Sequence, residues 1–71
     1  MVEVAMPMTG TVAEFDEERG LGTIISADGV TYPFHCTQIA DGSRRIDVGQ
    51  AVRFDLLAKL GRYEATAIEK V

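Results

Sequence analysis

The chain has 71 residues and a formal net charge of −4, from 7 basic and 11 acidic side chains. Apolar residues make up 46% and charged residues 25%, which is typical of a globular domain and unlike a disordered chain. This length allows one domain, near the lower limit for folding without disulfides or metals. The acidic balance argues against an anionic membrane surface as a partner, and it lowers the expectation of nucleic-acid binding.

The N-terminal segment and the cysteine content bear on location. Residues 1–8, MVEVAMPM, contain neither a basic residue nor a sustained apolar run, so we do not expect a signal peptide. The single cysteine, Cys36, excludes an intramolecular disulfide and is typical of a reducing compartment. We expect a cytoplasmic monomer with no membrane contact, in which residues 1–8 form a short flexible lead and residues 9–71 the one domain.

Frequent glycines divide the first half of the chain into short predicted strands. The first strand spans about residues 9–15, and the acidic run 16–18 turns the chain into a second strand over about 21–26. The pair Asp28-Gly29 predicts a hairpin turn into a third strand over about 31–36. In that strand Tyr32 and Phe34 share one face, so Pro33 lies on the other.

The second half begins with a polar connection, residues 37–50, in which Ile39 and Ile46 are apolar anchors. Residues 51–57 alternate in polarity, which favours a strand over the helix that the leucine spacing would also allow. After a loop around residues 58–62, residues 63–71 predict a fifth strand. Five short strands indicate an all-β fold, a small barrel that is closed or partly open. The predicted core consists of Val12, Ile24, Tyr32, Phe34, Ile39, Val52, Phe54 and Ile68.

Four motifs over about residues 9–68, TGTVAEFDEERGLGTI, YPFHCTQI, DVGQAVRF and EATAI, together resemble those of the cold-shock domain family. TGTVAEFDEERGLGTI is similar to the family's Gly-Lys-Val-Lys-Trp-Phe-Asn, linker and Lys-Gly-Phe-Gly-Phe-Ile, and YPFHCTQI is similar to Val-Phe-Val-His-Phe-Ser-Ala-Ile. DVGQAVRF resembles Glu-Glu-Gly-Gln-x-Val-x-Phe, and EATAI resembles Gln-Ala-x-Asn-Val. The motifs occur in the family's order with loops of fitting length. The resemblance implies a five-stranded antiparallel OB-fold barrel that binds single-stranded RNA or DNA.

The aromatic positions of the family are mostly changed in this chain. The resemblance implies an exposed face on which rings stack against bases. Glu14 stands at the tryptophan position, and Leu21 and Thr23 stand at two phenylalanine positions. Pro33 and Cys36 replace the phenylalanines on either side of the histidine. The chain therefore resembles a divergent member with a degenerate aromatic platform.

Several positions still offer a ring, an apolar contact or a positive charge to nucleic acid. The predicted nucleic-acid interface is Phe15, Arg19, Leu21, Thr23 and His35. Further candidates for phosphate contact are Arg44, Arg45 and Arg53. Each missing stack removes about 1–3 kcal/mol of binding free energy, and Glu14 repels phosphate. We therefore expect weak binding that weakens further with salt. An alternative role for Phe15 is as part of the core.

Catalysis and metal binding are not expected. The pair His35-Cys36 suggests a metal or a nucleophile and its base, but adjacent strand residues point to opposite faces. The chain has no other His or Cys to complete a zinc site, and Ser26 and Ser43 form no recognisable catalytic arrangement. We predict no cofactor and no enzyme activity. Two functions stay open: a weak single-strand nucleic-acid binder, which is favoured, and an OB-fold module repurposed for protein interaction or regulation.

Overall fold

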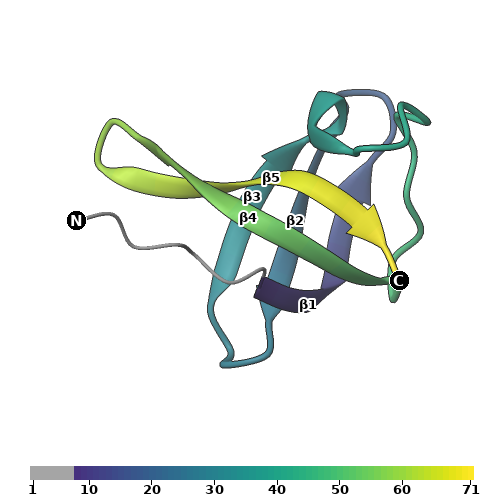
Figure 1. Cartoon of the computed structure of the whole chain (residues 1–71). Helices are drawn as coiled ribbons and strands as arrows, with labels where there is room; N and C mark the ends of the chain where they lie inside the picture. Colours follow the sequence, from purple (N-terminus) through teal and green to yellow (C-terminus); the bar gives the residue numbers. More distant parts are fainter. Residues whose placement is uncertain (1–7) are drawn as a thin grey trace.

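The computed structural model describes residues 8–71, which form five antiparallel strands and one turn of 3-10 helix (Figure 1). The elements are β1 (Met8–Asp16), β2 (Leu21–Ser26), β3 (Thr31–His35), η1 (Cys36–Gln38), β4 (Ala51–Lys59) and β5 (Arg62–Lys70). Strand β1 thus begins at Met8, within the predicted lead, and the rest of that lead lies outside the described residues. None of the described residues belongs to a helix long and apolar enough to cross a membrane.

The strands form one sheet in the order β3-β2-β1-β4-β5, and β4 and β5 cross in front of the first three strands in Figure 1. The edge strands β3 and β5 approach each other, but the hydrogen-bonded link between them comes after η1. There Ile39 pairs with Ile68 in a parallel bridge, and the Ala40 amide donates to the Ile68 carbonyl over 2.7 Å. The predicted five-stranded antiparallel barrel is confirmed, and it closes through η1.

The core fills the inside of this barrel with apolar side chains from every strand and from the connection. Its buried members are Val12, Ile24, Phe34, Ile39, Ile46, Val52, Phe54, Ala65 and Ile68. All the predicted core residues are buried except Tyr32, which is half-buried and packs its ring 6.0 Å from that of Phe54. Tyr32 is the second residue of β3, close to the β2–β3 turn. The anchors Ile39 and Ile46 are confirmed.

A β-bulge in β1 decides which side chains of that strand reach the outer face. Val12 pairs with Ile24, and the next paired residue of β1 is Glu14, so Ala13 is the extra residue. One extra residue reverses the alternation of side chains. Val12 is therefore buried while Glu14, two positions later, is exposed, and Phe15 packs against the core.

Gly22 allows two aromatic rings to meet across β2. It pairs with Phe15 on one side and with Phe34 on the other. The two rings stack with centroids 5.9 Å apart and planes 5° apart. A Cβ atom on Gly22 would lie 2.6 Å from the Phe34 ring and 2.6 Å from the Glu14 carbonyl oxygen. Glycine is therefore the residue that fits this position.

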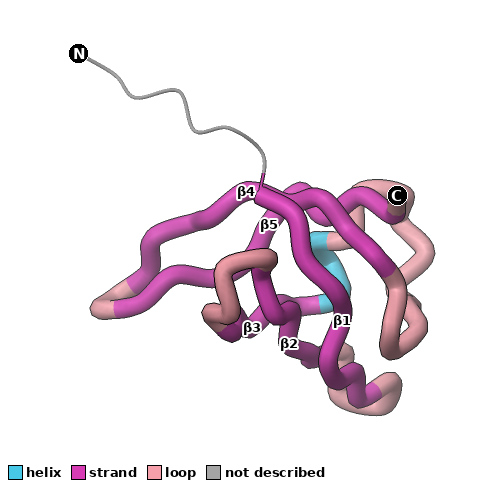
Figure 2. The backbone as a smooth tube through the Cα atoms, turned by 90° about the horizontal axis from the view of Figure 1, so that it is seen from below, coloured by secondary structure: helices cyan, strands magenta, loops and turns pink. Residues whose placement is uncertain are grey.

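The β4–β5 hairpin is longer than the sequence predicted. The loop expected around residues 58–62 consists only of Leu60 and Gly61, and Gly61 takes the positive φ of 78° that the turn requires. Lys59 pairs with Arg62 directly beside this turn. The hairpin extends past the rest of the barrel, as the view from below shows (Figure 2). The strand interpretation of residues 51–57 is confirmed.

Candidate nucleic-acid interface

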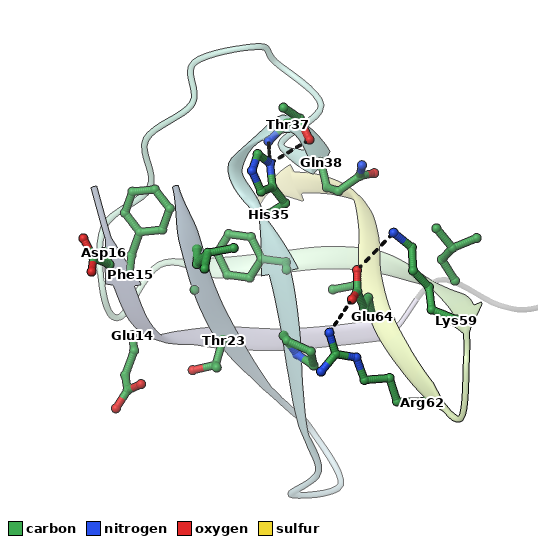
Figure 3. A pocket seen from close by; sticks show the side chains of 16 residues that line it. Glu14, Phe15, Asp16, Thr23, His35, Thr37, Gln38, Lys59, Arg62 and Glu64 are labelled. Atoms are coloured by element: carbon green, nitrogen blue, oxygen red, sulfur yellow. Dashed lines mark hydrogen bonds and ion pairs between the residues drawn. The ribbon is translucent and has the colours of Figure 1, made fainter. Parts of the chain in front are cut away.

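An open groove of about 740 Å³ lies where the outer face of β1–β3 meets the β4–β5 hairpin (Figure 3). Its lining comes from all five strands and from η1. The lining residues are Glu14, Phe15, Asp16, Leu21, Gly22, Thr23, Pro33, Phe34, His35, Thr37, Gln38, Leu57, Lys59, Arg62, Glu64 and Ala65. Four of the five predicted interface residues are in this set: Phe15, Leu21, Thr23 and His35.

Two cross-strand rows form the β1–β3 side of the groove. One row is Glu14, Thr23 and Pro33, and the other is Asp16, Leu21 and His35. Directly paired residues of neighbouring strands lie on the same face, so each row presents its side chains together. Four positions at which the family resemblance implies rings therefore lie in the groove: Glu14, Leu21, Thr23 and Pro33. The fifth, Cys36, begins η1 and does not line it.

The apolar surface of the groove is mostly aliphatic. Leu21 is 46% exposed, and Pro33 is half-buried beside it. Phe15 lines the groove, but one face of its ring is stacked on Phe34, and the side chain is half-buried. Phe15 thus packs against the core and also lines the groove, while its role in binding nucleic acid stays a prediction. A base entering here meets a partly covered ring and aliphatic groups.

His35 is held in one tautomer by η1. Its Nδ1 accepts a hydrogen bond from the Thr37 backbone amide at 3.2 Å and lies 2.9 Å from the Thr37 hydroxyl. A backbone N–H can only donate, so the neutral ring carries its proton on Nε2. The Cys36 sulfur lies 3.9 Å from the same Nδ1. Within residues 8–71, no three His, Cys, Asp or Glu side chains are grouped so that they could hold a metal ion.

The hairpin contributes two cations that the sequence analysis missed. Lys59 Nζ lies 3.5 Å from one carboxylate oxygen of Glu64, and Arg62 donates to the other over 3.0 Å. The Leu60-Gly61 pair in the sequence could have predicted this arrangement. A two-residue turn places the residues on either side of it, Lys59 and Arg62, opposite each other. Assigning this stretch to a loop concealed the relation between Lys59 and Arg62.

The arginines proposed from the sequence lie elsewhere. None of these four arginines lines the groove: Arg19, Arg44, Arg45 and Arg53. Arg19 is in the β1–β2 turn, where its Nε is 3.8 Å from a carboxylate oxygen of Asp16, at one end of the groove. Arg45 pairs with Glu17 at 3.0 Å. A role of Arg19 in binding stays a prediction.

The charge of the groove is divided between its two sides. Glu14 and Asp16 stand on β1, while Lys59 and Arg62 stand on the hairpin with Glu64 between them. Among residues 8–71, three carboxylates and two cations therefore line this groove. An anionic ligand would be attracted to the hairpin side and repelled from the β1 side.

The family follows from comparison with known proteins. The model of the cold-shock DNA-binding domain matches residues 8–71. The chain belongs to the cold-shock domain family. Among solved structures, it is similar to Drosophila Unr CSD456, with 28% sequence identity and a TM-score of 0.79. The alignment covers 93% of this chain and 27% of the Unr chain, so this chain spans about a quarter of that protein's solved length.

Proposed function

We propose that the chain is a single-stranded nucleic-acid-binding module that binds RNA or DNA weakly in the groove between β1–β3 and the β4–β5 hairpin. The observation that carries this proposal is that one open groove combines apolar side chains with two cations on its hairpin side. Membership of the cold-shock DNA-binding family supports it. A base needs apolar contact, and the phosphate next to it needs positive charge.

The proposed binding mode places bases over Leu21, Pro33 and the open part of Phe15. The phosphates then lie on the side of Lys59 and Arg62, away from the carboxylates of β1. Aliphatic contacts replace most of the stacking, so each base contributes less than the roughly 1–3 kcal/mol of a base–aromatic stack. With few rings and two cations, the affinity for a single strand is expected to be far below that of a cold-shock domain that keeps its aromatic residues.

The experiment is an NMR titration of the 71-residue chain with short pyrimidine-rich RNA and DNA strands, at low and at physiological salt. We expect shift changes at groove residues of β2, β3 and the hairpin, smaller at the higher salt because phosphate contacts release counterions. Comparison of the two strands shows which nucleic acid is preferred. If millimolar strand at low salt moves no resonance of the groove, nucleic-acid binding is abandoned.

A matched pair of variants tests the position of the phosphates. Lys59→Gln with Arg62→Gln removes the two groove cations. Arg53→Gln with Lys70→Gln removes the same charge from residues that do not line the groove. The first variant should lose most of the binding and the second much less. Equal losses would place the phosphates outside the groove.

Protein interaction is the second candidate, and the tip of the hairpin favours it. Leu60 is fully exposed there, and Tyr63 is 56% exposed beside it. A partner that covered both side chains would bury apolar surface that is now exposed to water. This candidate becomes the preferred one if the titration shows no shifts in the groove.

A further inference from the structure

Glu64 holds both cations of the groove. Its carboxylate oxygens lie 3.5 Å from Lys59 Nζ and 3.0 Å from an Arg62 terminal nitrogen (Figure 3). The Glu64 side chain is 18% exposed, whereas those of Lys59 and Arg62 are 53% and 66% exposed. The carboxylate is therefore the partly covered member, and the two cations reach it from the open side.

The strand pairing explains this arrangement. Lys59 and Arg62 are opposite each other, and Leu57 and Glu64 form the next pair but one along the hairpin. Side chains two positions apart on a strand share a face, so all these residues project from one face of the hairpin. That face lines the groove. The sequence thus places one carboxylate next to the two cations that a phosphate would use.

We propose that Glu64 is an internal competitor for phosphate, which a bound strand must displace from Lys59 and Arg62. This inference rests on the proposed function and names the residue that limits it. A carboxylate and a phosphate oxygen bind the same guanidinium donors. An exposed ion pair is weak, so exchange of one anion for the other is feasible, but each exchanged contact contributes less affinity than a free cation would. Glu64 therefore sets how tightly the groove holds a strand.

Two variants with the same charge change test this directly. Glu64→Gln keeps the size of the side chain and releases Lys59 and Arg62. Glu69→Gln releases Arg53 from a comparable pair, 2.9 Å long, at a position that does not line the groove. Both variants carry a net charge of −3 instead of −4, so a general effect of charge appears equally in both. The Kd for a short pyrimidine-rich single strand is measured at several salt concentrations for each variant and for the wild type.

We expect Glu64→Gln to bind about 3–10 times more tightly at low salt, with a logarithmic salt slope steeper by about 0.7–1.4, as for one or two added phosphate contacts on a single strand. Glu69→Gln should change affinity by less than about twofold. In a background of Arg62→Gln, the gain from Glu64→Gln should be smaller, because only Lys59 is then left for the substitution to release. Glu64→Ala should raise affinity in the same direction, and thermal melting of each variant establishes that it is folded.

The outcomes separate this inference from the proposed function. If the wild type binds and Glu64→Gln is no better than Glu69→Gln, competition by Glu64 is overturned while nucleic-acid binding stands. A loss of affinity in both Glu64 variants also overturns it, since Glu64 would then be positioning the cations for the ligand. If neither the wild type nor any variant binds a strand, the proposed function fails first and this inference with it.

Discussion

At the position where the cold-shock family carries a tryptophan, Glu14 projects from the outer face of β1 opposite Thr23. Pro33 continues the same row on β3, and Leu21 lies in the neighbouring row. Where the family resemblance implies rings, these four positions hold an acid, a hydroxyl, an imino acid and an aliphatic group. The difference from the aromatic face that the family resemblance implies therefore lies in the side chains of Glu14, Leu21, Thr23 and Pro33.

Restoring the rings should restore affinity. We expect Glu14→Trp with Leu21→Phe and Thr23→Phe to tighten single-strand binding at least about tenfold, because each stack contributes about 1–3 kcal/mol. The measurement is the Kd for the same short strand by fluorescence or NMR. Glu18→Trp is the control, since it removes the same charge and adds a ring in the β1–β2 turn, outside the groove. An unchanged Kd in the triple variant would mean that the face itself no longer fits bases.

At the scale of elements, two bulges decide which residues face the core. In β1 the extra residue Ala13 separates Val12 from Glu14 in the register. In β5 the register passes from Glu69 to Thr66 while β4 passes from Arg53 to Asp55, so two residues of β5 face one of β4. Inward side chains then occur three positions apart, which simple alternation does not predict. Ala65 and Ile68 are both buried for this reason.

The bulge in β5 contains a conformation that alanine adopts reluctantly. Ala67 has φ of 51°, a left-handed value that costs a non-glycine residue about 1–2 kcal/mol and that asparagine tolerates better. Ala67 stands where the family resemblance places asparagine, and it is exposed. We therefore expect Ala67→Asn to raise the free energy of unfolding by about 0.5–1 kcal/mol, measured by urea denaturation.

The control for this prediction is Ala58→Asn, at an exposed position of β4 with an ordinary strand backbone. Asparagine is unfavourable in a regular strand, so this variant should be slightly less stable than the wild type. If Ala67→Asn destabilises the protein as Ala58→Asn does, the left-handed backbone at position 67 is not a source of strain.

At the scale of the whole molecule, one small core holds together the strands that form the groove. The Phe34 ring lies under the β2–β3 side and stacks on Phe15, while Phe54 brings β4 into the same core. Both rings are almost fully buried, at 2% and 1% exposure. Stability and groove shape therefore depend on the same side chains.

Removing either ring should leave much of the protein unfolded. Phe34→Ala or Phe54→Ala is expected to cost about 3–5 kcal/mol, out of the roughly 5–15 kcal/mol typical of a whole domain. Circular dichroism during thermal or urea unfolding measures the loss. The exposed ring of Tyr63 gives the control, because Tyr63→Ala should change stability by no more than about 0.5 kcal/mol. Melting of Phe34→Ala within a few degrees of the wild type would show that its ring is not needed in the core.

The sequence by itself determined the five strands, the cold-shock resemblance and nearly all of the core, because short-range polarity patterns and turn residues are local properties. It also identified four groove residues, Phe15, Leu21, Thr23 and His35, through the motifs that contain them. Only the tertiary structure decided that Lys59 and Arg62 also line the groove and that Arg19 does not. That outcome depends on the length and direction of the β4–β5 hairpin, which brings residues far apart in the chain against β1–β3. Sequence patterns describe neighbours along the chain, whereas the charge of a groove depends on neighbours in space.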